Sequence, residues 1–165
     1  MDGLLLPVLL VAQGVMAGVD TVLNHEVIAR LPQRPEARGE LGLHVLRELI
    51  WMALFAGLAW FAWHGAAAAV IAALLAVEIV VTACDELVEN RIRVLPQNER
   101  VLHLFLTLNL GVIVVLLAPS LIDWWGQPTA LSPRSYGVFS WLLTLLALPA
   151  AFWALRDFIA WRRLR

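Results

Sequence analysis

The chain has 165 residues, of which 61% are hydrophobic, and its formal net charge is −1 at pH 7. This apolar share is far above that of soluble domains, so the excess must face lipid, and the sequence predicts an all-α integral membrane protein. The 12 basic residues are all arginine and form no basic stripe, so we expect no nucleic-acid partner, and the single Cys84 excludes an internal disulfide.

Five apolar runs follow one another along the chain, separated by proline and glycine. They cover residues 4–23, 49–63, 66–83, 102–122 and 136–155. A membrane span needs about 20 residues, so the second and third runs must include their polar ends, residues 40–48 and 85–93. Asp2 stands where a signal peptide carries positive charge, so we expect the first run to remain as a span. The sequence thus predicts one transmembrane domain over residues 1–165, with the fifth helix at about residues 135–163.

Arginine residues gather at alternate connections between the predicted spans. They lie before the second run, around the start of the fourth and near the C-terminus, as Arg30, Arg34, Arg38, Arg91, Arg93, Arg100, Arg156, Arg162, Arg163 and Arg165. Positive residues favour the cytoplasm, so we expect the N-terminus outside and the C-terminus inside. Trp60, Trp63, Trp124 and Trp125 then fall together at the outer interface, as an aromatic belt does. The lysine-free, alanine- and leucine-rich composition suggests a bacterial inner membrane.

A short motif occurs twice, at the two connections expected on the cytoplasmic side. I-A-R-L-P-Q begins at Ile28 and I-R-V-L-P-Q begins at Ile92. Each copy is followed by a Glu-x-x-x-His pair, Glu40 with His44 and Glu99 with His103. The repeat predicts two helical hairpins, at about residues 4–64 and 66–124, which would form a pseudo-twofold bundle of four helices.

Helical spacing brings ionisable residues of four spans to one level. Residues four apart share a helix face, which joins the members of each Glu-x-x-x-His pair. On the third span, Glu78, Thr82, Asp85 and Glu89 form a single stripe. Carboxylate oxygen and imidazole nitrogen together suit iron, manganese or zinc. The candidate metal ligands are the two pairs, completed by Glu26 or His25 from the first span and by Glu89 or Asp85 from the third: His25, Glu26, Glu40, His44, Asp85, Glu89, Glu99 and His103.

In its residue types, this set resembles the di-metal carboxylate bundle proteins, including membrane-bound di-iron oxidases. In that class two helices each give a glutamate and two others each give a Glu/His pair. The resemblance covers about the first two-thirds of the chain and implies two metal ions, with iron expected. The class spaces its Glu and His three residues apart, whereas both pairs here are four apart, so a one-metal site and a zinc or manganese site stay open.

Glu78 is the candidate catalytic residue, because an acid inside a span costs about 3 kcal/mol at the bilayer centre and is rare without a function. It would relay protons, and the simpler alternative is a carboxyl group hydrogen-bonded to Asn109 or Thr107. A lattice of ion pairs with arginine would explain the acids of the cluster but not its three histidines.

The leading hypothesis is an integral-membrane metalloenzyme, an oxidoreductase acting on a lipophilic molecule that arrives through membrane lipid. The alternatives are a zinc-dependent hydrolase, which would use a metal-bound water, a proton or metal transporter, and a non-catalytic membrane subunit.

Overall fold

The computed structural model describes residues 4–164 and is 85% helical, which confirms the predicted all-α class. Its long helices are α1 (Leu5–Val19), α2 (Arg38–Trp60), α3 (Ala68–Ile92), α4 (Gln97–Trp125) and α5 (Val138–Arg163). A π-helix, η1 (Asp20–Ala29), continues α1 without a break. Within the described residues, five helical stretches are long and apolar enough to cross a membrane, as the composition predicts.

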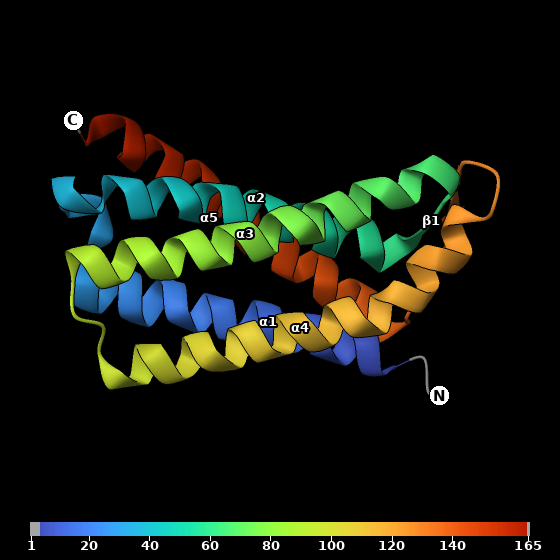
Figure 1. Ribbon diagram of the computed structural model, residues 1–165, viewed down its shortest axis with the longest axis horizontal. Coiled ribbons are helices and arrows are strands. Elements are labelled where there is room, and N and C mark those ends of the chain that lie inside the picture. Colours follow the sequence, from blue (N-terminus) through green and yellow to red (C-terminus); the bar gives the residue numbers. More distant parts are fainter. Residues whose placement is uncertain (1–3, 165) are drawn as a thin grey trace.

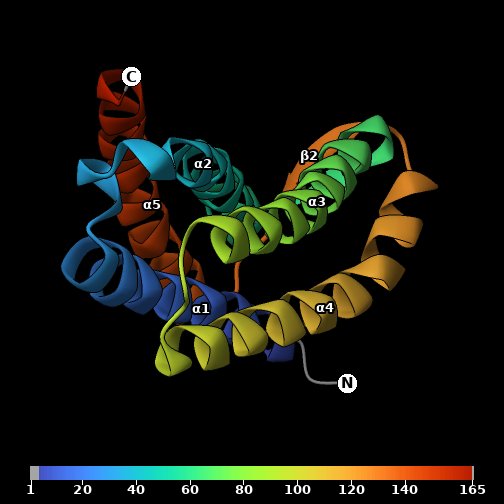
Figure 2. The same ribbon diagram turned by 60° about the vertical axis from the view of Figure 1, so that its left-hand side comes forward.

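The five helices pack in a closed ring (Figures 1 and 2). Helix α2 packs most extensively against α5 and also against α3; α3 lies beside α4, α4 beside α1, and α1 beside α5. The predicted pseudo-twofold bundle of two hairpins is not confirmed, because α5 packs against both α1 and α2 and is an integral member of the bundle. The fifth helix therefore closes the ring between α1 and α2.

The two ends of the ring differ in structure. At one end lie the α1–α2 and α3–α4 connections and the end of α5, together with most of the arginines (Figure 1). At the other end β1 (Phe61–His64) pairs antiparallel with β2 (Ala130–Pro133), and this short ribbon was not predicted from the sequence. Gly65 follows β1 with φ 57°, and a Cβ there would lie 2.6 Å from the Thr129 nitrogen, so this turn requires glycine.

The two L-P-Q copies reverse the chain at the same end of the ring with different backbones. In the first, Arg30 adopts a left-handed conformation, and the 3₁₀ turns η2 (Leu31–Gln33) and η3 (Pro35–Ala37) lead into α2. In the second, α4 begins directly at Gln97. The leucine of each copy is buried, so the shared motif provides an anchoring side chain at each connection.

The apolar core lies between the arginine-rich end and the β-ribbon. It is built from fully buried side chains of all five helices, among them Leu10, Leu54, Ile71, Ile113 and Leu143. Large apolar side chains are also exposed on the outer face of each helix. Because a soluble protein of this size rarely exposes so much contiguous apolar surface, the outer surface fits a lipid environment.

Candidate metal centre

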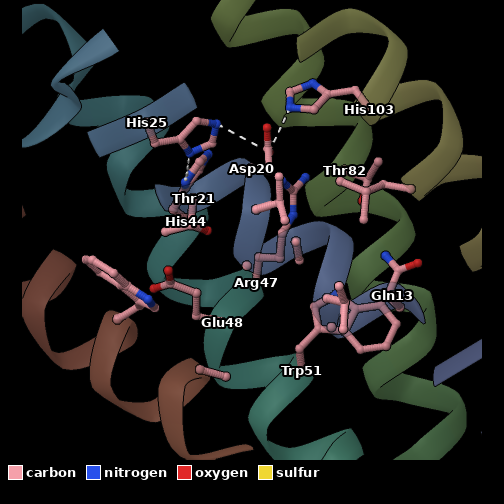
Figure 3. A pocket seen from close by; sticks show the side chains of 18 of the residues that line it. Gln13, Asp20, Thr21, His25, His44, Arg47, Glu48, Trp51, Thr82 and His103 are labelled. Carbon is pink, nitrogen blue, oxygen red and sulfur yellow. Dashed lines mark hydrogen bonds and ion pairs between the residues drawn. The ribbon is translucent and has the colours of Figure 1, made fainter. Parts of the chain in front are cut away.

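Acids and imidazoles from four helical segments meet between the helices near the arginine-rich end. Figure 3 shows His25 and His44 facing each other, with Asp20 between His25 and His103. The buried carboxyl groups of this cluster come from η1, α2, α3 and α4, and they are Asp20, Glu40, Glu78, Asp85, Glu89 and Glu99. His25 and His44 are buried and His103 is half-buried. The cluster thus lies inside the ring of helices.

The π-helix η1 brings Asp20 and His25 to one face. In an α-helix, two residues five apart lie about 140° from each other around the axis. In a π-helix, five residues close a hydrogen-bonded turn, and the His25 Nε2 lies 3.4 Å from the Asp20 Oδ2. Asn24 donates a 2.7 Å hydrogen bond to the other oxygen of Asp20 and fixes that carboxylate. Glu26 lies apart from the cluster and pairs with Arg156 of α5.

Each of the three imidazoles contacts a carboxylate, and His25 and His44 also contact each other. The Nδ1 atoms of His25 and His44 lie 3.0 Å apart, so one ring donates, the other accepts, and at least one of the two is uncharged. The His103 Nε2 lies 3.0 Å from Asp20, and its Nδ1 lies 3.4 Å from the Glu89 Oε2. His103 of α4 therefore joins an acid of η1 to an acid of α3.

Arg93, in the connection between α3 and α4, binds three glutamates from three helices. Its Nη2 donates to Glu40 at 2.8 Å, to Glu89 at 3.2 Å and to Glu99 at 2.6 Å, and its Nη1 donates to Glu99 at 2.8 Å. Burial lowers the pKa of the Arg93 guanidinium, but the hydrogen bonds and charges of Glu99 and Glu40 outweigh it and raise that pKa overall. Arg93 thus forms part of the network of arginine–carboxylate ion pairs that the acidic residues of the sequence suggested as an alternative to a metal site.

Several buried atoms of the cluster remain without a hydrogen-bond partner. They are the Nε2 atoms of His25 and His44, the Oε2 atoms of Glu40 and Glu89, and the Oδ1 of Asp85. A buried polar atom without a partner costs free energy, and these atoms are of metal-ligand type. Two guanidinium groups, Arg47 and Arg93, pair with five of the six buried carboxyl groups, so four negative charges would remain with all six carboxyls ionised and the imidazoles neutral.

Three overlapping groups of these residues have ligand atoms within 4.8 Å of one another. The groups are Asp20/His25/Glu99/His103, His25/Glu40/His44/Glu89 and Glu86/Glu89/His103. Metal–nitrogen and metal–oxygen bonds of roughly 2.0–2.2 Å place two ligand atoms of one ion at most about 4.4 Å apart, so separations of up to 4.8 Å would need to close by only a few tenths of an ångström on binding. The buried His, Asp and Glu residues could therefore hold a metal ion.

The structure brings six of the eight predicted ligands into these groups, and both Glu-x-x-x-His pairs face the cluster. Asp85 lies in the cluster but outside the groups, 3.4 Å from the His44 Nε2 and 2.8 Å from the Arg47 Nη1. Glu26 does not belong to the cluster, and we remove it from the ligand set. Asp20 was not among the predicted ligands. The sequence showed only that Asp20 and Asn24 are four residues apart and so share one face of the first span.

Glu78 lies at the far end of the α3 stripe, three stripe positions from Glu89, which belongs to the metal groups. Its Oε1 accepts a 2.8 Å hydrogen bond from the Trp51 Nε1 and a 3.4 Å bond from the Thr82 hydroxyl, while its Oε2 has no partner. The expected alternative partner Asn109 instead donates to Gln13 at 2.7 Å. Glu78 is thus positioned by α2 and α3 alone.

A cavity of about 560 Å³ adjoins the cluster and is lined by residues of all five helices. One end is polar, with Asp20, His25, His44, Arg47 and His103 in its wall (Figure 3). The remaining wall is mostly apolar and includes Val15, Phe55, Leu110, Leu146 and Trp153. A volume of this size lies within the range of small-molecule sites, roughly 300–1,000 Å³.

No protein-family model, curated protein or solved structure matches this chain. The resemblance to di-metal carboxylate proteins therefore stays at the level of residue types, and the function must be argued from the site itself.

Proposed function

We propose that this protein is an integral-membrane metalloenzyme, an oxidoreductase that binds two metal ions in the cluster and acts on a lipophilic molecule held in the adjoining cavity. One observation supports this above all. Imidazole nitrogens and carboxylate oxygens from η1, α2, α3 and α4 converge in a buried space, and several of them have no hydrogen-bond partner.

In this proposal each ion is bound by residues from several helices. Asp20, Glu99 and His103 would hold the first ion. Glu40, His44 and Glu89 would hold the second, with His25 completing that set. Two divalent cations would balance the four excess negative charges, which a lattice of arginines leaves uncompensated. Arg93 would position Glu40, Glu89 and Glu99 through the oxygens that face it.

The donor set guides the choice of metal and of reaction. Carboxylate oxygens outnumber imidazole nitrogens, and sulfur is absent from the groups among the described residues, which favours iron or manganese over a structural zinc site. Iron would supply oxygen activation and electron transfer. The chain itself would hold the substrate against Val15 and Phe55, and Glu78, oriented by Trp51, would exchange protons at its free Oε2.

We further propose that the cluster faces the cytoplasmic interface of a bacterial inner membrane. The arginine-rich end of the ring is the end that contains the cluster, and positive residues favour the cytoplasmic side. Substrate would then arrive laterally from the lipid and reach the cluster near the inner leaflet.

Elemental analysis of the detergent-purified protein tests the proposal. We expect about two iron ions per chain and their loss in the His44→Ala/His103→Ala double variant, because each proposed ion loses a ligand. His64→Ala is the matched control, since His64 lies on β1 at the opposite end of the ring. Circular dichroism verifies that each variant is helical, and Glu40→Gln provides a conservative second variant.

Two results would contradict the proposal: wild-type protein without stoichiometric metal, or a double variant that keeps its full metal content. One zinc ion per chain instead of iron would favour a zinc-dependent hydrolase over the oxidoreductase.

A further inference from the structure

Two glutamates face the cavity but belong to none of the metal-binding groups. Glu48 of α2 lines the cavity, and both of its carboxylate oxygens are buried without a hydrogen-bond partner. Glu78 of α3 is 1% exposed and also lines the cavity, and its Oε2 has no partner. The metal proposal gives Glu48 no role, so this residue needs a separate explanation.

Little positive charge is available to these carboxylates. Arg47 is the one arginine among the residues that line the cavity, and its Nη1 lies 2.8 Å from Asp85. Its Nε lies 3.5 Å from the Glu78 Oε1, too far for a strong hydrogen bond. Arg156 of α5 pairs with Glu26 and Asp157. The cavity wall therefore presents more hydrogen-bond acceptors and negative charge than donors and positive charge.

Burying carboxylates without partners is expensive, and the cost falls when a bound group supplies both positive charge and N–H donors. A primary ammonium group has three such donors and no acceptor. A neutral alcohol would supply a single donor and no charge, and a fatty acid would add negative charge. The cavity wall thus favours a protonated amine over either of these polar groups.

The rest of the cavity suits an apolar chain. Gly14, Val15 and Gly18 of α1 form one wall, and Leu146 and Pro149 of α5 belong to another. Val15 and Val22 line the cavity and are also 52% and 49% exposed, so the cavity reaches the outer surface of the ring. An apolar chain could therefore enter from the lipid while its polar end lies inside.

We propose that the cavity binds an aliphatic primary amine, with its ammonium group at Glu48, Glu78 as the second carboxylate, and its chain along α1 and α5. This inference names the substrate class of the proposed metalloenzyme, and it rests on that proposal only in treating the amine as a substrate. Binding of the amine depends on the cavity alone.

The test measures binding of radiolabelled dodecylamine to the protein in nanodiscs of zwitterionic lipid, by scintillation proximity. We expect saturable binding of one dodecylamine per chain, with affinity about tenfold higher than that of dodecanol, because the ammonium group forms charge-assisted hydrogen bonds that the alcohol does not. Dodecanoate should not compete. Equal competition by dodecanol or dodecanoate would overturn the amine assignment.

Four variants locate the binding site. Glu48→Gln keeps the shape but not the charge, and it should lower dodecylamine affinity about tenfold while leaving dodecanol affinity unchanged; Glu78→Gln should lower dodecylamine affinity less. Gly18→Phe should weaken both ligands, because Gly18 lines the cavity and its Cβ would meet open space. Gly111→Phe is the matched control, since Gly111 is equally open but lies outside this cavity. Unchanged dodecylamine affinity in Glu48→Gln would contradict the proposal.

Metal content measured on the same samples separates the two proposals. Dodecylamine binding by protein that contains no metal would support the amine site and contradict the metalloenzyme. Stoichiometric metal without dodecylamine binding would contradict the amine site and leave the metal centre intact.

Discussion

At the scale of single residues, Arg93 compensates the negative charge of the buried glutamates that it contacts. Its guanidinium is the positive charge that Glu40, Glu89 and Glu99 share, and these acids come from three different helices. Removing one partner of a buried ion pair leaves the other charge uncompensated. Arg93 therefore ties together the ends of α2, α3 and α4 as well as orienting the predicted metal ligands.

Replacing Arg93 by alanine should destabilise the protein by about 3–5 kcal/mol, the usual cost of breaking a buried ion pair. The check is the thermal unfolding midpoint in detergent, followed by circular dichroism. Arg100→Ala is the control, because Arg100 is exposed on α4 and has no ion pair among the described residues. Added ferrous iron should restore part of the Arg93→Ala midpoint if ions occupy the cluster. Equal midpoints for the two variants would show that Arg93 is dispensable.

At the scale of elements, the π-helix η1 decides which acid of the first span enters the cluster. In η1, Asp20 and His25 form one side of the site, and Glu26 lies instead against Arg156 of α5. π-Helical turns are rare and occur often at functional sites. The local departure from α-helical geometry is therefore what completes the first group of candidate metal ligands.

Because Asp20 faces the cluster and Glu26 faces Arg156, substitutions at these two positions of η1 should differ in their effect on metal content. Asp20→Asn should lower the metal content about as much as His103→Ala, because both remove a ligand of the same proposed ion. Glu26→Gln should keep the full metal content, because Glu26 lies outside the cluster. Elemental analysis of the three purified variants beside wild type provides the measurement. Metal loss in Glu26→Gln with none in Asp20→Asn would mean that η1 turns its other face inward.

The difference between η1 and the other elements explains what could be predicted from the sequence. Both Glu-x-x-x-His pairs and the stripe from Glu78 to Glu89 were predictable, because they lie on regular α-helices with a fixed period. The position of Asp20 was not, since residues 20–29 contain no pattern that distinguishes a π-helix from an α-helix. The role of Arg93 was also hidden, because its side chain reaches the cluster from a connection between helices.

At the scale of the whole molecule, the number of helices was predictable and their arrangement was not. Lipid thickness fixes the length of a span, so apolar runs reveal five helices. Which helices pack against each other can be predicted when an amphipathic pattern distinguishes the buried face of a helix from its outer face. Here every helix exposes large apolar side chains on its outer face, so the sequence pattern does not make that distinction. The L-P-Q repeat suggested paired hairpins, whereas α5 packs against both α1 and α2.

The orientation of the ring determines which compartment the cluster faces, and single-cysteine labelling tests it. Cys84 is first replaced by serine, and a cysteine is then introduced by Glu36→Cys in η3 or Gln127→Cys after α4, both at exposed positions. The arginine distribution predicts that a membrane-impermeant maleimide labels Gln127→Cys in intact bacterial cells and Glu36→Cys only after permeabilisation. These substitutions leave every arginine in place, so the signal that sets the orientation is unchanged. The reverse labelling pattern would place the cluster at the outer face, and the proposed metal ions would then come from outside the cell rather than from the cytoplasm.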